Sequence, residues 1–325
     1  MRRPWKSYWS PTPSETRIQA RILAGEALYR SGRFMEAGGV WTRVLADEPE
    51  NIDALRWLGV AHYEVGALPH AENYLRKVAL LDANDPRPLR VIGLLYRDVE
   101  EHGNAVEAYR ESLRRDPEQP EIAAVRFEMA DSLHQLHQDR EALELLESCD
   151  ASADVFTVRA ACLMNLARTD EATRMLDEAI LQDPHHAGAL AMRGRIALEK
   201  GDAIAAERFL RRAKRISPQS IDVLHSLIAT YLRLGEPAKA KAAQQELKNA
   251  ETTWDEYHKL VNRAADDAAD AHVRFELGLY ASRLGLNDTA KWWLRAAVYL
   301  DPKSEEAAAA LKKLNHPYEQ AQSLE

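Results

Sequence analysis

The sequence predicts an all-α solenoid built from about eight copies of one helix pair. Alanines recur at intervals of 34, 34, 37, 30, 34, 34 and 50 residues, each near the start of an amphipathic run that follows a turn-like segment. A glycine or alanine lies twelve positions before seven of them, and a proline lies twelve positions after five. The recurring alanines are Ala37, Ala71, Ala105, Ala142, Ala172, Ala206, Ala240 and Ala290.

With each of these alanines numbered as position 20, every unit divides into a helix A, a turn and a helix B. The small residue at position 8 lies on helix A and the alanine lies on helix B, so the two helices can approach closely where they cross. Apolar residues around position 8 complete an i, i+4 stripe on helix A. Large apolar or aromatic residues occupy position 24, and the prolines end helix B. Glycines mark the turn at position 15 in five units, namely Gly32, Gly66, Gly201, Gly235 and Gly285.

This combination of positions resembles the tetratricopeptide repeat (TPR) family, as in WLGVAHYEVG at 57–66 and YRESLRRDP at 109–117. The resemblance implies antiparallel helix pairs stacked into a right-handed superhelix, with helix A lining the concave face. Elementary packing leads to the same architecture, because a single hairpin cannot bury its apolar stripe and neighbouring units must cover it.

The predicted boundaries follow the register of the alanines. A basic and aromatic arm is expected at 1–17, a repeat array at 18–303, a capping helix at 304–314 and a tail at 315–325. Within the array, a helical insertion is expected near 255–270. The units are expected near 18–51, 52–85, 86–119, 123–152, 153–186, 187–220, 221–254 and 271–303. The irregular spacing around Ala142 predicts a local change of pitch. The insertion carries Trp254, Tyr257 and Val261 at helical spacing, and it either lengthens helix B of unit seven or adds a helix.

Composition narrows the class of protein. Lysine and arginine number 43 against 51 aspartates and glutamates, so with a net charge of −8 no nucleic-acid partner is expected. Two cysteines are too few for a disulfide framework. The sequence has no run of 18 apolar residues, and a cytoplasmic location is predicted. The basic and aromatic start of the chain also fits the flank of a membrane anchor upstream in a longer parent chain.

The sequence contains no motif typical of a nucleotide-binding, serine hydrolase or zinc protease site. His134 and His137 can share a helix face with Asp131, which is a potential metal trio, but plain surface histidines are the favoured interpretation. We therefore expect no enzyme activity, no cofactor and no metal.

Positions 2, 5, 9 and 12 of helix A are left to face the concavity once the apolar stripe packs. In units two and three they hold four arginines and a tyrosine, and guanidinium groups suit carboxylate or phosphate ligands. Pairing of these arginines with Asp53, Glu64 and Asp98 is an equally weighted alternative. Further along, the lining is mixed and suits a peptide with polar and apolar anchors. The candidate groove residues are Arg56, Tyr63, Arg87, Arg90, Arg97, Phe127, Asp131, His134, Arg195 and His225.

The leading hypothesis is a non-catalytic scaffold that binds a peptide or protein segment in its concave groove, with an acidic or phosphorylated partner as its more specific form. Two alternatives stay open. One is a subunit or soluble domain of a larger, membrane-anchored assembly, and the other is the repeat arm of an enzyme whose site is not recognised.

The register predicts that Ala206→Leu destabilises the chain by about 1–3 kcal/mol, because a larger side chain would enter a tight helix crossing. Chemical denaturation of this variant beside the parent chain measures the loss. An unchanged denaturation midpoint would contradict the register.

Overall fold

The computed structural model describes residues 13–267 and 269–315, and these ranges contain 17 α-helices. The helices pair in chain order as eight antiparallel hairpins followed by one last helix, which confirms the predicted all-α fold. The helices are α1 (Pro13–Arg30), α2 (Phe34–Asp47), α3 (Ile52–Glu64), α4 (Leu68–Leu81), α5 (Arg87–Asp98), α6 (His102–Arg115), α7 (Ile122–Gln135), α8 (Asp139–Leu146), α9 (Ala153–Asn165), α10 (Thr169–Gln182), α11 (Ala187–Glu199), α12 (Ala203–Ile216), α13 (Ile221–Arg233), α14 (Pro237–Asp266), α15 (Ala271–Arg283), α16 (Asn287–Leu300) and α17 (Glu305–Asn315).

In five hairpins a large side chain of helix B fills the space above a glycine of helix A. A Cβ atom added to Gly93 would lie 2.4 Å from Cε1 of Tyr109, and one added to Gly194 would lie 2.6 Å from Cγ of Leu210. Tyr109 and Leu210 are completely buried. The close crossing predicted from the small residue at position 8 is therefore present. It makes room for the large side chain at position 24.

The turn between the two helices keeps one backbone geometry even where the sequence does not supply glycine. All five turn glycines have φ between +69° and +86°. In units three, four and five the same position is taken by Glu100, His137 and Ala167, whose φ angles are +61°, +59° and +59°. Left-handed φ at a residue with a Cβ is uncommon, so the stacking of the hairpins imposes this turn on the chain.

Three boundaries differ in detail from the expected register. Helix α1 begins at Pro13 rather than at residue 18, and proline suits a first helical turn because it has no N–H group to leave unpaired. The expected arm and tail otherwise fall on residues 1–12 and 316–325, outside the described part of the chain. Helix α14 runs unbroken for 30 residues, so the inserted residues lengthen helix B of unit seven instead of adding a helix. Helix α8 has only eight residues, where the spacing of the alanines is irregular.

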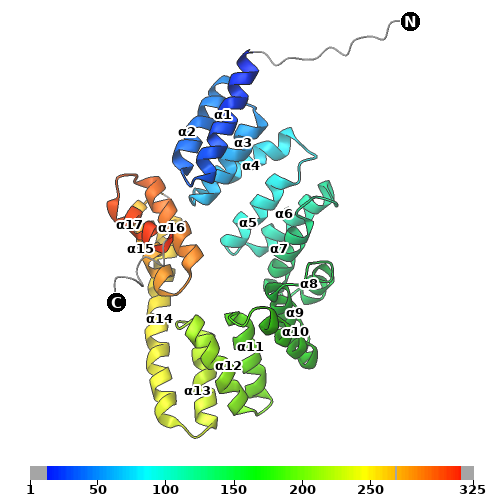
Figure 1. Cartoon of the computed structure of the whole chain (residues 1–325), viewed down its shortest axis with the longest axis vertical. Helices are drawn as coiled ribbons and strands as arrows, with labels where there is room; N and C mark the ends of the chain where they lie inside the picture. Colours follow the sequence, from blue (N-terminus) through cyan, green and yellow to red (C-terminus); the bar gives the residue numbers. More distant parts are fainter. Residues whose placement is uncertain (1–12, 268, 316–325) are drawn as a thin grey trace, which may run out of the picture.

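The stack of hairpins bends until its two ends meet (Figure 1), and α16 contacts α3 across more than 220 residues of sequence. The indole Nε1 of Trp292 donates a hydrogen bond to the carbonyl of Tyr63 at 3.0 Å. Nη1 of Arg295 lies 2.8 Å from Oε2 of Glu64, and the same guanidinium lies over the ring of Phe34. The sequence pattern contained no sign of this closure, which turns a solenoid into a ring.

We expect Trp292→Ala to open the ring, because it removes the hydrogen bond to Tyr63 and the apolar contact with the turn at Gly66. Small-angle X-ray scattering should show a larger radius of gyration. The neighbouring Trp293→Ala is the matched control, because Trp293 donates its hydrogen bond to Tyr257 of α14 and not across the closure. Equal scattering profiles for Trp292→Ala and the parent chain would show that other contacts close the ring.

Candidate functional site: the inner face of the ring

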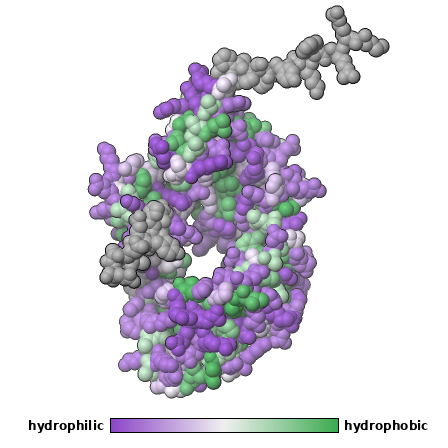
Figure 2. Space-filling model, in the orientation of Figure 1, coloured by the Kyte–Doolittle hydropathy of each residue, from purple (hydrophilic) through white to green (hydrophobic). Residues whose placement is uncertain are grey.

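The A helices of the hairpins line the inside of the ring. In Figure 1, helices α5, α7 and α11 lie on its inner side and their partners α6, α8 and α12 lie on the outer side. Figure 2 shows an opening that passes through the molecule, so the inner face is an accessible surface. Because α16 contacts α3, this surface is enclosed by the chain on all sides.

The arginines of α3 and α5 lie in ion pairs. Arg56 is paired with Asp53 at 2.7 Å and with Asp85 at 2.8 Å. Asp85, which is nearly fully buried, also accepts hydrogen bonds from Nε and the backbone N–H of Arg87. Arg87 is the most exposed of the four arginines, with 62% of its side chain accessible.

Arg90 and Arg97 are paired as well. Arg90 contacts Glu121 and is paired with the buried Glu128 at 2.7 Å. Arg97 is paired with Asp98 at 3.1 Å, and Asp98 also accepts a hydrogen bond from the hydroxyl of Tyr63. Several of these contacts join one hairpin to the next, so they form a ladder of polar bridges between consecutive A helices.

The ladder changes the pKa values of its members. Burial alone would raise the pKa of Asp85, but the hydrogen bonds from Arg87 and the charge of Arg56 outweigh it and keep this pKa below its usual value. The hydrogen bond with Glu128 raises the pKa of Arg90. Asp85 and Arg90 are thus held in their charged forms, and an acidic ligand would have to displace a carboxylate that is already bound.

The remaining candidate residues have different surroundings. Phe127 packs against the core around α7, and the Nδ1 atom of His134 lies 2.6 Å from Oδ1 of Asp139. In the described chain Asp131 and His225 have no side-chain hydrogen bond or ion pair. Arg195 has only one side-chain contact of this kind in the described residues, a weak one with Sδ of Met164 at 3.8 Å.

The sequence reasoning identified part of this network. It named Asp53 and Asp98 as partners of the arginines, and in the structure Asp53 pairs with Arg56 and Asp98 pairs with Arg97. It also named Glu64, which instead pairs with Arg295 at the closure. It missed the two buried partners, Asp85 in the loop between α4 and α5 and Glu128 on α7, because the bridges Arg56–Asp85 and Arg90–Glu128 join residues about 30 or more positions apart.

The inner face between α9 and α13 has more unpaired groups. Arg195 and His225 are exposed, and Leu232 is 58% exposed on α13. Leu198 and Met164 are half-buried at the corresponding positions of α11 and α9. Figure 2 shows hydrophobic surface along the edge of the opening that lies toward α11–α13. This region offers apolar and cationic groups that are not already bound to each other.

The closure contains a half-buried histidine. His62 stacks on Tyr74 and on His70, its Nδ1 lies 3.4 Å from the hydroxyl of Tyr299, and the ring of Tyr299 meets it edge-on. Burial lowers the pKa of His62 to about 4, and positive charge on His70 adds to this effect. The closure therefore favours the neutral imidazole.

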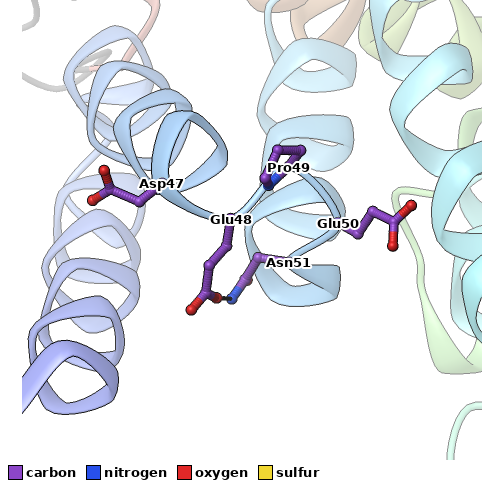
Figure 3. Close-up of a pocket in the computed structure, with 5 residues that line it drawn as sticks. All are labelled: Asp47, Glu48, Pro49, Glu50 and Asn51. Atoms are coloured by element: carbon purple, nitrogen blue, oxygen red, sulfur yellow. Dashed lines mark hydrogen bonds between the residues drawn. The ribbon is translucent and has the colours of Figure 1, made fainter. Parts of the chain in front are cut away.

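Two surface hollows lie at loops between the hairpins. One is formed by the α2–α3 turn, where Asp47 and Glu50 point to solvent in different directions and Glu48 accepts a hydrogen bond from Asn51 (Figure 3). A second lies between two inter-repeat loops and includes Asp82, Asp85, Asp116 and Glu121. Both are open and mostly acidic, and neither brings together groups that would hold a small ligand.

Comparisons with known proteins agree with this geometry. Family models described as tetratricopeptide repeats match residues 22–87 and 163–221, residues 197–264 and residues 91–119. The chain belongs to the tetratricopeptide repeat family. Proteins of this family mediate protein–protein interactions and are typically non-catalytic scaffolds. No match was found among curated proteins. Among the described residues, no helix is both long and apolar enough to cross a bilayer.

Solved structures similar to the TPR chain include PilF of Pseudomonas aeruginosa, with a TM-score of 0.56 and 20% identity over 64% of this chain and 95% of that one. The Cut9–Hcn1 hetero-tetramer of the APC/C has a TM-score of 0.48 and 15% identity over 94% and 57%. YrrB, titled as a TPR protein with an unusual peptide-binding site, has a TM-score of 0.48 and 22% identity over 57% and 96%. At these identities the similarity concerns the fold alone.

The lowered pKa of His62 predicts that acid weakens the closure of this TPR ring. An unfolded histidine titrates near pH 6.5, so the contribution of neutral His62 is complete above about pH 6.5 and is lost as the pH falls toward 4. Scattering measured across this range should show the radius of gyration rising in the parent chain. His62→Gln should flatten that part of the curve, whereas His225→Gln, at an exposed site, should not. Superimposable pH curves for the parent and His62→Gln would contradict the assignment.

Proposed function

We propose that this TPR protein is a non-catalytic scaffold that binds a peptide or extended protein segment against the inner face of its ring, chiefly along α9, α11 and α13. The observation that carries this proposal is the exposure of Leu232, Arg195 and His225, which the repeat register assigns to the same stretch of the inner face. None of the three has an ion-pair partner in the described residues. A ligand can therefore bind there without breaking contacts that hold the hairpins together.

The surface favours a segment with apolar anchors and an acidic or phosphorylated group. Leu198 and Leu232 supply apolar area at the same position of two neighbouring A helices. Arg195 lies three residues before Leu198 on α11, and its guanidinium can fork onto a carboxylate or phosphate of the partner. Of the arginines of α3 and α5, only Arg87 adds to the basic part of this surface. The side chains of the others are largely covered by the carboxylates with which they pair.

The ring limits the shape of the partner. The chain forms a ring around the inner face, so a globular surface cannot reach it. An extended strand or a single helix can enter through the opening in Figure 2. Peptide recognition by apolar anchors spaced along one helix or strand uses this kind of groove. The proposed ligand is therefore a segment of a protein and not a folded face.

Selection of peptides from a random displayed library against the parent chain tests the proposal. We expect selected peptides to lose about tenfold or more in affinity toward Leu232→Asp and toward Arg195→Glu, because each removes a central anchor.

Leu181→Asp and Arg211→Glu are the matched controls, since both residues are exposed on B helices (76% for Leu181). Peptides that bind all four variants as well as the parent chain would refute binding on the inner face. For a peptide with an acidic group, affinity should also fall as salt rises, because charge pairs at an exposed site are screened over roughly 8–10 Å at physiological ionic strength.

A further inference from the structure

Three different metal-binding side chains meet beside the fourth hairpin. His134 lies in the last turn of α7, Asp139 is the first residue of α8, and Cys162 lies within α9. One ligand atom of each, a ring nitrogen, a carboxylate oxygen and a thiol sulfur, all lie within 4.8 Å of one another. Asp139 and Cys162 are buried, and His134 is about one-fifth exposed. Three separate helices therefore converge on one small volume.

Asp139 differs from the other buried carboxylates of the described chain. Asp85 is paired with two arginines, and Glu128 is paired with Arg90. Asp139 is equally buried, yet no lysine or arginine within the described ranges pairs with it. Burial of a carboxylate is costly unless a cation or several hydrogen bonds compensate for it. Among the described residues, Asp139 is therefore the one buried carboxylate that has no lysine or arginine partner and can accept an added cation.

We propose that His134, Asp139 and Cys162 form a zinc site with mixed nitrogen, oxygen and sulfur ligands. This site goes beyond peptide binding and does not depend on it. Zn²⁺ accepts all three ligand types in tetrahedral geometry, which leaves a fourth position for water or for a group of a partner. Cys162 binds as the thiolate, and its proton passes to solvent as the Zn–S bond forms.

The distances fit such a site after a small movement. With bonds of about 2.0–2.1 Å to nitrogen and oxygen and about 2.3 Å to sulfur, tetrahedral ligands lie about 3.6 Å apart for N···S and about 3.3 Å apart for N···O. Nδ1 of His134 is 3.7 Å from Sγ of Cys162, which already matches. It is 2.6 Å from Oδ1 of Asp139, so this pair must separate, and the partly exposed ring of His134 is free to make that shift.

A second layer of contacts orients the carboxylate. Nδ2 of Asn165 donates hydrogen bonds to both oxygens of Asp139, at 3.1 and 3.3 Å. Outer partners of this kind fix the direction of metal ligands in protein sites. The ion would join α7, α8 and α9 at the unit whose helix B is only eight residues long, and so compensate for contacts that a longer helix supplies elsewhere.

Titration of the metal-free chain with Co²⁺ tests the site, because a thiolate ligand gives a near-ultraviolet charge-transfer band that histidine and carboxylate ligands do not. We expect the band at one equivalent per chain and its removal by Zn²⁺. Cys149→Ser leaves Cys162 as the only thiol, so the band should persist in that variant and be lost in Cys162→Ser. Asp139→Asn should weaken Zn²⁺ binding at least tenfold, and Asp170→Asn, at an exposed carboxylate of α10 that pairs with Lys200, should not.

The test remains decisive if Cys162→Ser fails to fold, because the band in Cys149→Ser by itself assigns the ligand. Absence of the band in both the parent chain and Cys149→Ser would overturn the proposal and leave a plain hydrogen bond between His134 and Asp139. A band that persists in folded Cys162→Ser would overturn it as well, since Cys149 would then be the ligand.

Discussion

The contact between position 8 of helix A and position 24 of helix B fixes the geometry on which the rest of the structure depends. A glycine such as Gly194 lets Leu210 lie directly on the backbone of helix A, and this sets the distance and angle between the two helices. Because the same contact recurs, each hairpin presents nearly the same surface to the next. A small rotation between neighbours then adds up along the array, as expected for a protein in which each repeat contacts mainly its neighbours.

The closure of the ring follows from this accumulated curvature. The stack already brings α16 to α3, so the hydrogen bond of Trp292 and the ion pair of Arg295 need only hold two ends that lie close together. A partly exposed ion pair contributes little alone, about 0–1 kcal/mol. Its position matters more than its strength, because it joins units that are more than 220 residues apart in the sequence. The inner face consequently becomes an enclosed surface rather than an open groove.

Features with a local signature in the sequence could be predicted, and features that depend on how separate hairpins meet could not. The hairpins, their crossings and the capping helix α17 all have a local signature. The turn geometry at Glu100, His137 and Ala167 lacks one, because stacking imposes it on residues that do not prefer it. The arginines were identified as a group, but Asp85 and Glu128 depend on how one hairpin is rotated against the next. In the sequence Trp292 is an ordinary residue of helix B, and its role in the closure depends on the meeting of the two ends of the ring.

The inner face divides into two parts with different physical character. Along α3, α5 and α7, the charged groups are already paired in bridges such as Arg90–Glu128. These pairs stabilise the stack, and few charged groups remain for a ligand. Along α9, α11 and α13, the exposed Arg195 and His225 have no ion-pair partner among the described residues, and Arg195 makes only a weak contact with Met164. A ligand gains most where it does not compete with internal pairs, because a buried carboxylate left without its arginine would cost more than a new surface pair returns. In the proposed function, the network that stabilises one half of the ring thus leaves the other half as the binding surface.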